Sequence, residues 1–167
     1  MTKHSAGILL YRKAGDSYEV LIVHPGGPFW AKKDDGVWSI PKGEFGDGEE
    51  PLAAAKRELA EELGRHVPKG ELAPLGEAKQ PSGKVVHIWA LEADLDTDKI
   101  KSNTLTIDWP PRSGKKMEIP EVDRAGWFSL SDAAAKLLPG QLPFLDRLAE
   151  HLDTSLEPPE PKQASLF

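Results

Sequence analysis

The 167-residue sequence contains no cysteine, which excludes disulfide bonds, thiolate metal sites and a cysteine nucleophile. An excess of positive charge is also lacking. The 21 lysines and arginines are outnumbered by 27 acids, which gives a net charge of −6. Sustained contact with a nucleic-acid backbone needs positive charge, so we expect no nucleic-acid partner. Long hydrophobic runs are missing as well. The run Ala6–Tyr11 is too short for a secretory signal or a membrane span, so we expect a cytoplasmic protein with no membrane contact.

The composition that remains is typical of one compact domain, with 39% hydrophobic and 29% charged residues. We expect this domain to cover residues 1–152. The segment 153–167 is rich in proline and acids and has no periodic apolar face. It therefore predicts a disordered tail.

Strand-like and helical patterns follow one another along the domain without strict alternation. Runs rich in Val, Ile, Thr and aromatic residues predict strands, and apolar residues three and four apart predict helices. The resulting expectation is an α+β fold, or an α/β/α sandwich. The expected strands are a hairpin over 5–24 and single strands over 37–40, 72–80, 84–94, 104–109 and 125–130, with a turn between 41 and 44; the expected helices are 50–63, 131–138 and 141–152.

The helix expected over residues 50–63 has an apolar stripe on one face and a cluster of acids on the other. Leu52, Leu59 and Leu63 form the stripe, while Pro51 and Gly64 suit its first turn and its C-terminal cap. The acids Glu58, Glu61 and Glu62 stand at i, i+3 and i+4, where they repel one another by a few tenths of a kcal/mol per pair. Such clustered oxygen ligands suit Mg²⁺ or Mn²⁺. A plain solvated helix face is the alternative for these acids alone.

A longer pattern around this helix favours the metal site. From Gly43 to Gly64 the fixed positions resemble the signature of the Nudix hydrolase family, which includes MutT-like enzymes and dinucleoside polyphosphate hydrolases. The resemblance implies an α/β/α sandwich with a mixed central sheet, and metal-dependent hydrolysis of a nucleoside diphosphate linked to another group. The matching positions are Gly43, five residues, Glu49, seven residues, Arg57, Glu58, Leu59, one residue, Glu61, Glu62, one residue and Gly64.

The same resemblance implies a role for each residue of the motif. Glu58, Glu61 and Glu62 are expected to bind the metal and orient the base, with the Gly43 carbonyl as a further ligand. Arg57 is expected to complete the catalytic set through an ion pair with Glu49. Arg65 departs from the pattern, which has an apolar residue there, and we expect it to pair with Glu61 instead.

A carboxylate from a later segment is expected to join the metal site or to accept the proton from water. Glu118 and Glu121 are the two late acids considered, and Glu121 is the one that we assign as a metal ligand. For either of them, an ordinary surface acid is the alternative.

The substrate is less well defined by the sequence. The segment "VWSIPKGE" resembles the entry to the motif in dinucleoside polyphosphate hydrolases, and it brings Lys42 towards a phosphate. In the preceding loop, Trp30 could stack on a base, and Lys32 and Lys33 could bind a phosphate tail. The alternative is an ordinary surface loop with no role in binding. We therefore expect a dinucleoside polyphosphate or a nucleoside triphosphate. Pro81 lies where ADP-ribose pyrophosphatases have a proline, so ADP-ribose or another nucleotide sugar is the alternative.

The sequence also bears on two other functional classes, an isomerase and a nucleotide sensor, and on one protein partner. A Nudix-fold isomerase of isoprenoid diphosphates uses a cysteine, which this chain lacks. A non-catalytic nucleotide sensor is expected to have lost the helix acids, which are intact here. The final residues "QASLF" resemble the bacterial sliding-clamp-binding pentapeptide, which implies clamp contact through Gln163, Leu166 and Phe167.

Overall fold

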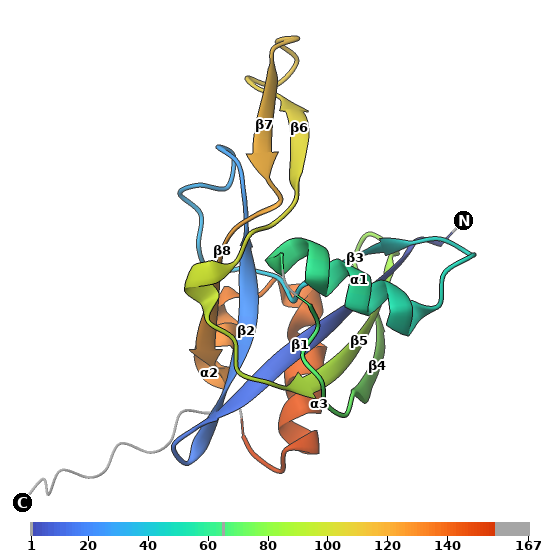
Figure 1. The fold of residues 1–167 in the computed structure, drawn as a ribbon, viewed down its shortest axis with the longest axis vertical. Coiled ribbons are helices and arrows are strands. Elements are labelled where there is room, and N and C mark those ends of the chain that lie inside the picture. Colours follow the sequence, from blue (N-terminus) through green and yellow to red (C-terminus); the bar gives the residue numbers. More distant parts are fainter. Residues whose placement is uncertain (1, 65, 156–167) are drawn as a thin grey trace, which may run out of the picture.

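The computed structural model describes residues 2–64 and 66–155. Its main sheet has six strands in the order β4-β5-β1-β2-β8, with β3 also paired to β1 (Figure 1). The β1–β5 pair is parallel and the other pairs are antiparallel, so the sheet is mixed. The strands are β1 (His4–Ala14), β2 (Ser17–Pro25), β3 (Lys42–Phe45), β4 (Ala73–Lys79), β5 (Val85–Glu92) and β8 (Val122–Ser129).

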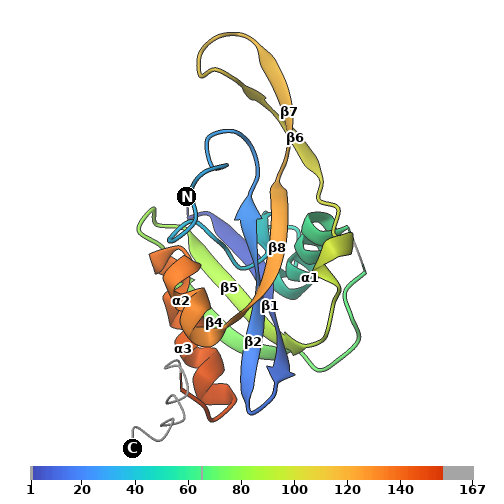
Figure 2. The same ribbon diagram turned by 90° about the vertical axis from the view of Figure 1, so that its left-hand side faces the viewer.

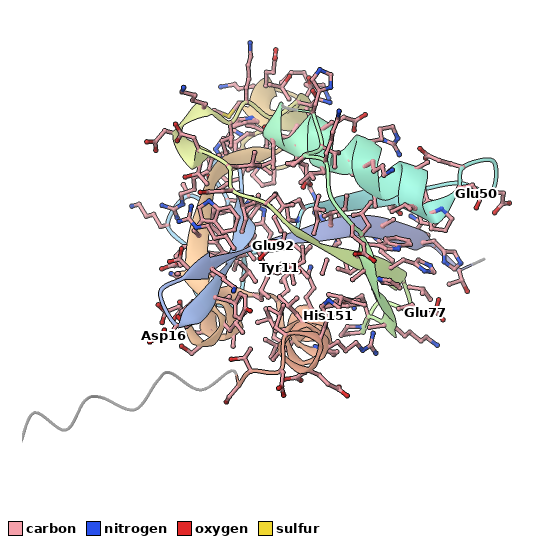
Figure 3. The ribbon with its side chains drawn as sticks, turned by 60° about the horizontal axis from the view of Figure 1, so that its bottom comes forward. Tyr11, Asp16, Glu50, Glu77, Glu92 and His151 are labelled. Atoms are coloured by element: carbon pink, nitrogen blue, oxygen red, sulfur yellow. The ribbon has the colours of Figure 1, made fainter. Side chains whose placement is uncertain are left out.

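Helices cover both faces of this sheet. Helix α1 (Pro51–Leu63) lies on one face, and α2 (Leu130–Lys136) and α3 (Leu142–His151) lie on the other (Figure 2). Figure 3 shows the same layers, with Glu50 at the start of α1 and His151 at the end of α3 on opposite sides of the strands. Two short 3₁₀ turns, Thr97–Lys99 and Pro139–Gln141, complete the elements. The expected α/β/α sandwich with a mixed sheet is confirmed.

The central strands are buried on both faces because each face carries its own core. In β1, Ile8 and Leu10 pack towards α1, whereas Leu9 packs towards α2 and α3. In β2, Leu21 belongs to the core under α1, and Ile22 belongs to the core under α2 and α3. Successive strand side chains point to opposite faces, so a continuous apolar run is the pattern that such a strand requires.

Helix α1 has the bounds that the sequence predicts. Pro51 occupies its first turn, and Gly64 ends it in the left-handed conformation with φ = 65°. The Gly64 N–H donates to the carbonyl of Ala60 at 2.7 Å, which closes the last turn. Leu59 and Leu63 are buried against the sheet, and Glu58 is also buried, beside Gly43 of β3.

The expected strand at 37–40 and the expected turn after it were wrong. Residues 37–40 form only isolated bridges, from Ser39 to Val23 and from Trp38 to Leu137. The regular strand is β3, which pairs with the first residues of β1. A Cβ at position 7 would collide with the Pro41 carbonyl. The glycine at this position of β1 therefore allows the segment before β3 to pack closely against β1.

A separate two-stranded hairpin projects from the main body (Figure 1). It consists of β6 (Thr104–Asp108), which was expected as a strand, and β7 (Lys116–Pro120), which was not. Within the described ranges, no helix is long and apolar enough to span a membrane. Arg65 and the segment 156–167, with the clamp-binding residues proposed in it, lie outside the described residues.

Candidate active site

The acids of α1 face β3. Glu58 is 8% exposed, and its carboxyl group lies where a Cβ on Gly43 would be placed. Only glycine fits at position 43 while Glu58 keeps this position. The structure therefore brings the backbone of Gly43 and the first acid of the cluster into direct contact.

Arg57 holds three carboxylates around one guanidinium group. Its Nε and Nη2 donate to the two oxygens of Glu49 at 2.8 and 2.9 Å. Its Nη1 donates to Glu58 at 2.9 Å and to Glu61 at 3.3 Å. The hydrogen bonds with Glu49 raise the pKa of Arg57, and the same bonds lower the pKa of Glu49. The expected Arg57–Glu49 ion pair is thus present, and it fixes the loop before α1 to the helix.

Glu62 is the most perturbed acid of the cluster. Burial raises its pKa to about 8, with the Glu58 and Glu121 charges adding to the effect and Lys42 opposing it. One Glu62 oxygen accepts a hydrogen bond from the backbone N–H of Lys42 at 3.1 Å. Burial also raises the pKa of Glu58, which Arg57 opposes. Burial is thus the main cause of both raised pKa values, and the neighbouring carboxylates add to it.

Glu121 reaches this cluster from the other end of the chain. It directly precedes β8, and its charge acts on both Glu58 and Glu62. Its backbone N–H donates to the Asn103 carbonyl at 2.9 Å, and the Asn103 N–H donates to the Glu61 carbonyl at 3.1 Å. Glu118 is not brought to the cluster, since it lies on the projecting hairpin and accepts from the Thr104 hydroxyl at 2.8 Å.

Lys42 meets the cluster mainly through its backbone. Burial, followed by the neighbouring Lys84 ammonium, lowers the pKa of Lys42, while Glu62, Glu44 and Glu58 raise it. The ammonium group is thus within electrostatic reach of the same acids. It lies on a half-buried side chain rather than in open solvent.

The loop before β3 carries Trp30, Lys32 and Lys33. The Lys33 ammonium lies 3.8 Å from the centre of the Phe29 ring and 5.3 Å from that of Trp30, while Lys32 is exposed. The two rings pack edge to face, with their centres 4.7 Å apart. This loop stands beside the hairpin β6–β7 rather than over the helix acids (Figure 2).

Comparison with known proteins identifies the family to which this site belongs. The family model described as the NUDIX domain matches residues 1–148. The chain belongs to the Nudix family. As a Nudix enzyme with its three helix acids intact, it is a hydrolase of phosphoric anhydride bonds.

Solved structures with this Nudix fold include an Ap4A hydrolase, an NrtR domain and a MutT protein. An Ap4A hydrolase of C. elegans in a binary complex is 20% identical, with a TM-score of 0.63 over 89% of this chain and 98% of that one. The NUDIX domain of NrtR from Shewanella oneidensis, complexed with ADP ribose, is 17% identical, with a TM-score of 0.62 over 91% and 89%. A MutT structure from work on Aliivibrio salmonicida and Vibrio cholerae is 19% identical, with a TM-score of 0.53 over 89% and 96%. At these identities the likeness establishes the fold.

The donor set of this Nudix site fits a hard divalent cation. Glu58 and Glu62 lie close together in a buried setting, and the Glu121 charge acts on both, so a cation among them would offset their mutual repulsion. Among the described residues, no three His, Asp or Glu side chains already surround one point. Oxygens of Glu58 and Glu61 instead face Arg57, and an oxygen of Glu62 faces the Lys42 N–H.

Sequence reasoning missed one buried histidine that bonds to a carboxylate. His24 was expected to be an ordinary strand or surface residue, but it is fully buried. Its Nδ1 bonds to the Asp123 carboxylate at 2.8 Å, and its Nε2 bonds to the Lys33 carbonyl at 2.6 Å. It therefore ties the loop that carries Trp30 to the start of β8. The sequence offers no spacing signal for a pair 99 residues apart.

Proposed function

We propose that this Nudix enzyme is a divalent-metal-dependent pyrophosphohydrolase. Its substrate would be a nucleoside diphosphate linked to another moiety, with a dinucleoside polyphosphate or a nucleoside triphosphate preferred. The observation that carries the proposal is the contact of the buried Glu58 carboxyl group with the Gly43 backbone, in a cluster where the charges of Glu58 and Glu121 also act on Glu62. Such excess negative charge is unfavourable for the fold alone and favourable for holding a cation.

Each group of the site has a part in this reaction. Glu58, Glu61, Glu62, Glu121 and the Gly43 carbonyl would hold Mg²⁺ or Mn²⁺. When bound, the cation offsets the charge of the phosphates and makes the attacking water more acidic. One of these glutamates accepts the proton from water as the new P–O bond forms and the anhydride P–O bond breaks. The departing phosphate keeps the electron pair of that bond.

The remaining residues would position these groups and the substrate. Arg57 bonds to Glu58 and Glu61, and so orients the acids without contacting the phosphates. Lys42 would neutralise a phosphate next to Glu62. Trp30, Lys32 and Lys33 would bind the part of the substrate that is not cleaved, with Lys33 already seated against the aromatic rings.

ADP-ribose or another nucleotide sugar is the second substrate class. It is supported by Pro81 and by the fold likeness to an NrtR domain complexed with ADP ribose. A non-catalytic sensor is disfavoured because the acids of α1 are intact. We expect the enzyme to act in the cytoplasm.

The test is product release across a panel of dinucleoside polyphosphates, nucleoside triphosphates and ADP-ribose, with Mg²⁺, with Mn²⁺ and with chelator. We expect one class to be hydrolysed only with metal. Glu62→Gln should lower kcat by about a hundredfold or more. Glu50→Gln is the matched control, because Glu50 precedes the same helix, is exposed and makes no side-chain cap bond. Turnover that persists in chelator, or in Glu62→Gln, would exclude this mechanism.

A separate proposal concerns a macromolecular partner. The C-terminal pentapeptide supports binding to a sliding clamp through Gln163, Leu166 and Phe167. Deleting residues 163–167 should abolish binding to purified clamp and leave hydrolysis unchanged. Equal binding by the full and shortened chains would rule this partner out.

A further inference from the structure

The projecting hairpin β6–β7 is amphipathic. Residues directly opposite each other on antiparallel strands share a face, so the register places four apolar side chains on one side. Polar residues occupy the other side, where Thr104 bonds to Glu118 and Lys116 pairs with Asp108. The apolar face consists of Leu105, Ile107, Met117 and Ile119.

Two of these four side chains are open to solvent. Ile119 is buried, but Leu105 is 39% and Met117 is 42% exposed. A two-stranded hairpin is marginally stable in water, and exposed apolar surface on it is unfavourable unless something covers that surface. The face is turned towards the loop that follows β2.

The hairpin face and this loop enclose a pocket of about 320 Å³. Gly26 and Gly27 form its base, and neither would tolerate a side chain. A Cβ on Gly26 would collide with the Pro120 carbonyl, and one on Gly27 with the Ile119 side chain. Phe29 and Trp30 stand at the mouth, with Phe29 52% exposed. The lining is Pro25, Gly26, Gly27, Pro28, Phe29, Trp30, Leu105, Ile107, Ile119, Pro120 and Glu121.

Glu121 links the pocket to the acid cluster. It lines the pocket and also acts on Glu58 and Glu62. The backbone bonds of Asn103 join Glu121 to α1 through the root of the hairpin. The Gly26 N–H donates to the Glu121 carbonyl at 3.1 Å, which fixes the other wall to the same residue.

We propose that this pocket binds the nucleobase of the substrate while its phosphates lie at the acid cluster. The proposal rests on the function proposed above, since it deepens the choice of substrate for the same site. A nucleobase has flat faces that stack on aromatic rings and pack on aliphatic side chains, which Trp30 and Leu105 provide. The volume lies at the lower end of small-molecule sites, about 300–1,000 Å³, which suits one base rather than a large partner.

The experiment compares two equally exposed residues of the same hairpin face. Leu105→Ser removes a wall of the pocket, whereas Met117→Ser changes the same face at a residue that does not line it. Adenosine and guanosine monophosphate are titrated into the full chain by calorimetry in chelator, with ribose 5-phosphate as the base-free probe. We expect Leu105→Ser to weaken binding of the nucleotides about tenfold and to leave ribose 5-phosphate unaffected. Met117→Ser should stay within about twofold of the wild type.

The turnover of the same variants separates this proposal from the hydrolase proposal. On the preferred substrate, Leu105→Ser should raise KM about tenfold with kcat within about twofold. If hydrolysis occurs but both variants bind nucleotides like the wild type, the pocket is not the base site and the hydrolase proposal stands. If nucleotides bind through Leu105 but no substrate is hydrolysed, the proposed function fails and the base site stands. A dimer in size-exclusion chromatography that both variants dissociate would assign the face to a second copy instead, and would overturn the proposal.

Discussion

The backbone of Gly43 lies against the Glu58 carboxyl group so closely that a methyl group at position 43 would overlap it. This contact joins the strand β3 to the helix α1 at the acid that is most enclosed by protein. It also places the Gly43 backbone beside one of the carboxylates that we propose to hold the cation. The geometry of the proposed metal site thus depends on position 43 being glycine, which has no side chain.

Gly43→Ala should therefore damage both folding and activity. Displacing Glu58 or shifting β3 should lower the free energy of unfolding by about 1–3 kcal/mol, as overpacking does. We expect kcat/KM to fall by about a hundredfold, because a carboxylate moves. Urea unfolding and steady-state kinetics measure the two effects. Gly46→Ala is the control, since among the described residues no atom lies within 4 Å of a Cβ at that position.

A lysine ammonium group should not be able to replace the guanidinium group of Arg57 in holding Glu49 and Glu58. Arg57→Lys keeps the charge but cannot reproduce the paired bonds to both Glu49 oxygens while also reaching Glu58. We expect kcat to fall at least about tenfold with KM changed little, because the acids lose their orientation. In a double-mutant cycle, Glu49→Gln should add little to Arg57→Lys. Independent, additive losses would show that the two residues do not act as a unit.

The raised pKa of Glu62 makes the metal-free fold less stable at alkaline pH. The pKa rises from an ordinary 4.5 to about 8, so between these values the folded state binds a proton that the unfolded state has lost. Stability should therefore fall as the pH increases from 4.5 through 8, and should level off above that. Glu62→Gln should remove this part of the pH dependence and should raise Tm at pH 9 by about 2–5 °C. Thermal unfolding in chelator from pH 5 to 9 is the measurement, and identical pH profiles would contradict the assignment.

The buried His24 should control the loop that carries Trp30. His24→Ala removes both hydrogen bonds at once, to Asp123 and to the Lys33 carbonyl. We expect a loss of about 2–3 kcal/mol in stability and faster tryptic cleavage after Lys32 and Lys33. His151→Ala, at the exposed end of α3, is the control. Unchanged cleavage rates would mean that the loop is held by other contacts.

The parts of the fold that were predictable from sequence are those set by local pattern. Helix α1 carries its own start, apolar stripe and C-terminal glycine, so its bounds follow from residues next to one another. The strand β3 does not, because "KGEF" has little strand propensity and is extended only by pairing with β1. The same holds for β7, whose partner β6 supplies the register.

The same distinction applies to the site. The acids of α1 and the Arg57–Glu49 pair lie within one continuous motif, so its resemblance to the Nudix signature identified them. The position of Glu121 depends on backbone bonds through Asn103, and the His24–Asp123 pair joins β2 to β8. Contacts of this kind arise from the tertiary fold, and no spacing within a single segment encodes them.

The hairpin β6–β7 stands outside the main sheet, and the acids stand on a helix packed against that sheet. In the described part of the chain, backbone bonds from Lys101 and Asn103 to α1, and from Glu121 to Asn103, join the two. Side chains along the hairpin can therefore be exchanged without disturbing the layer that carries the hydrolytic acids. For protein engineering, this means that a library confined to Leu105, Ile107 and Ile119 could retune which molecule is recognised while the cleavage step stays intact.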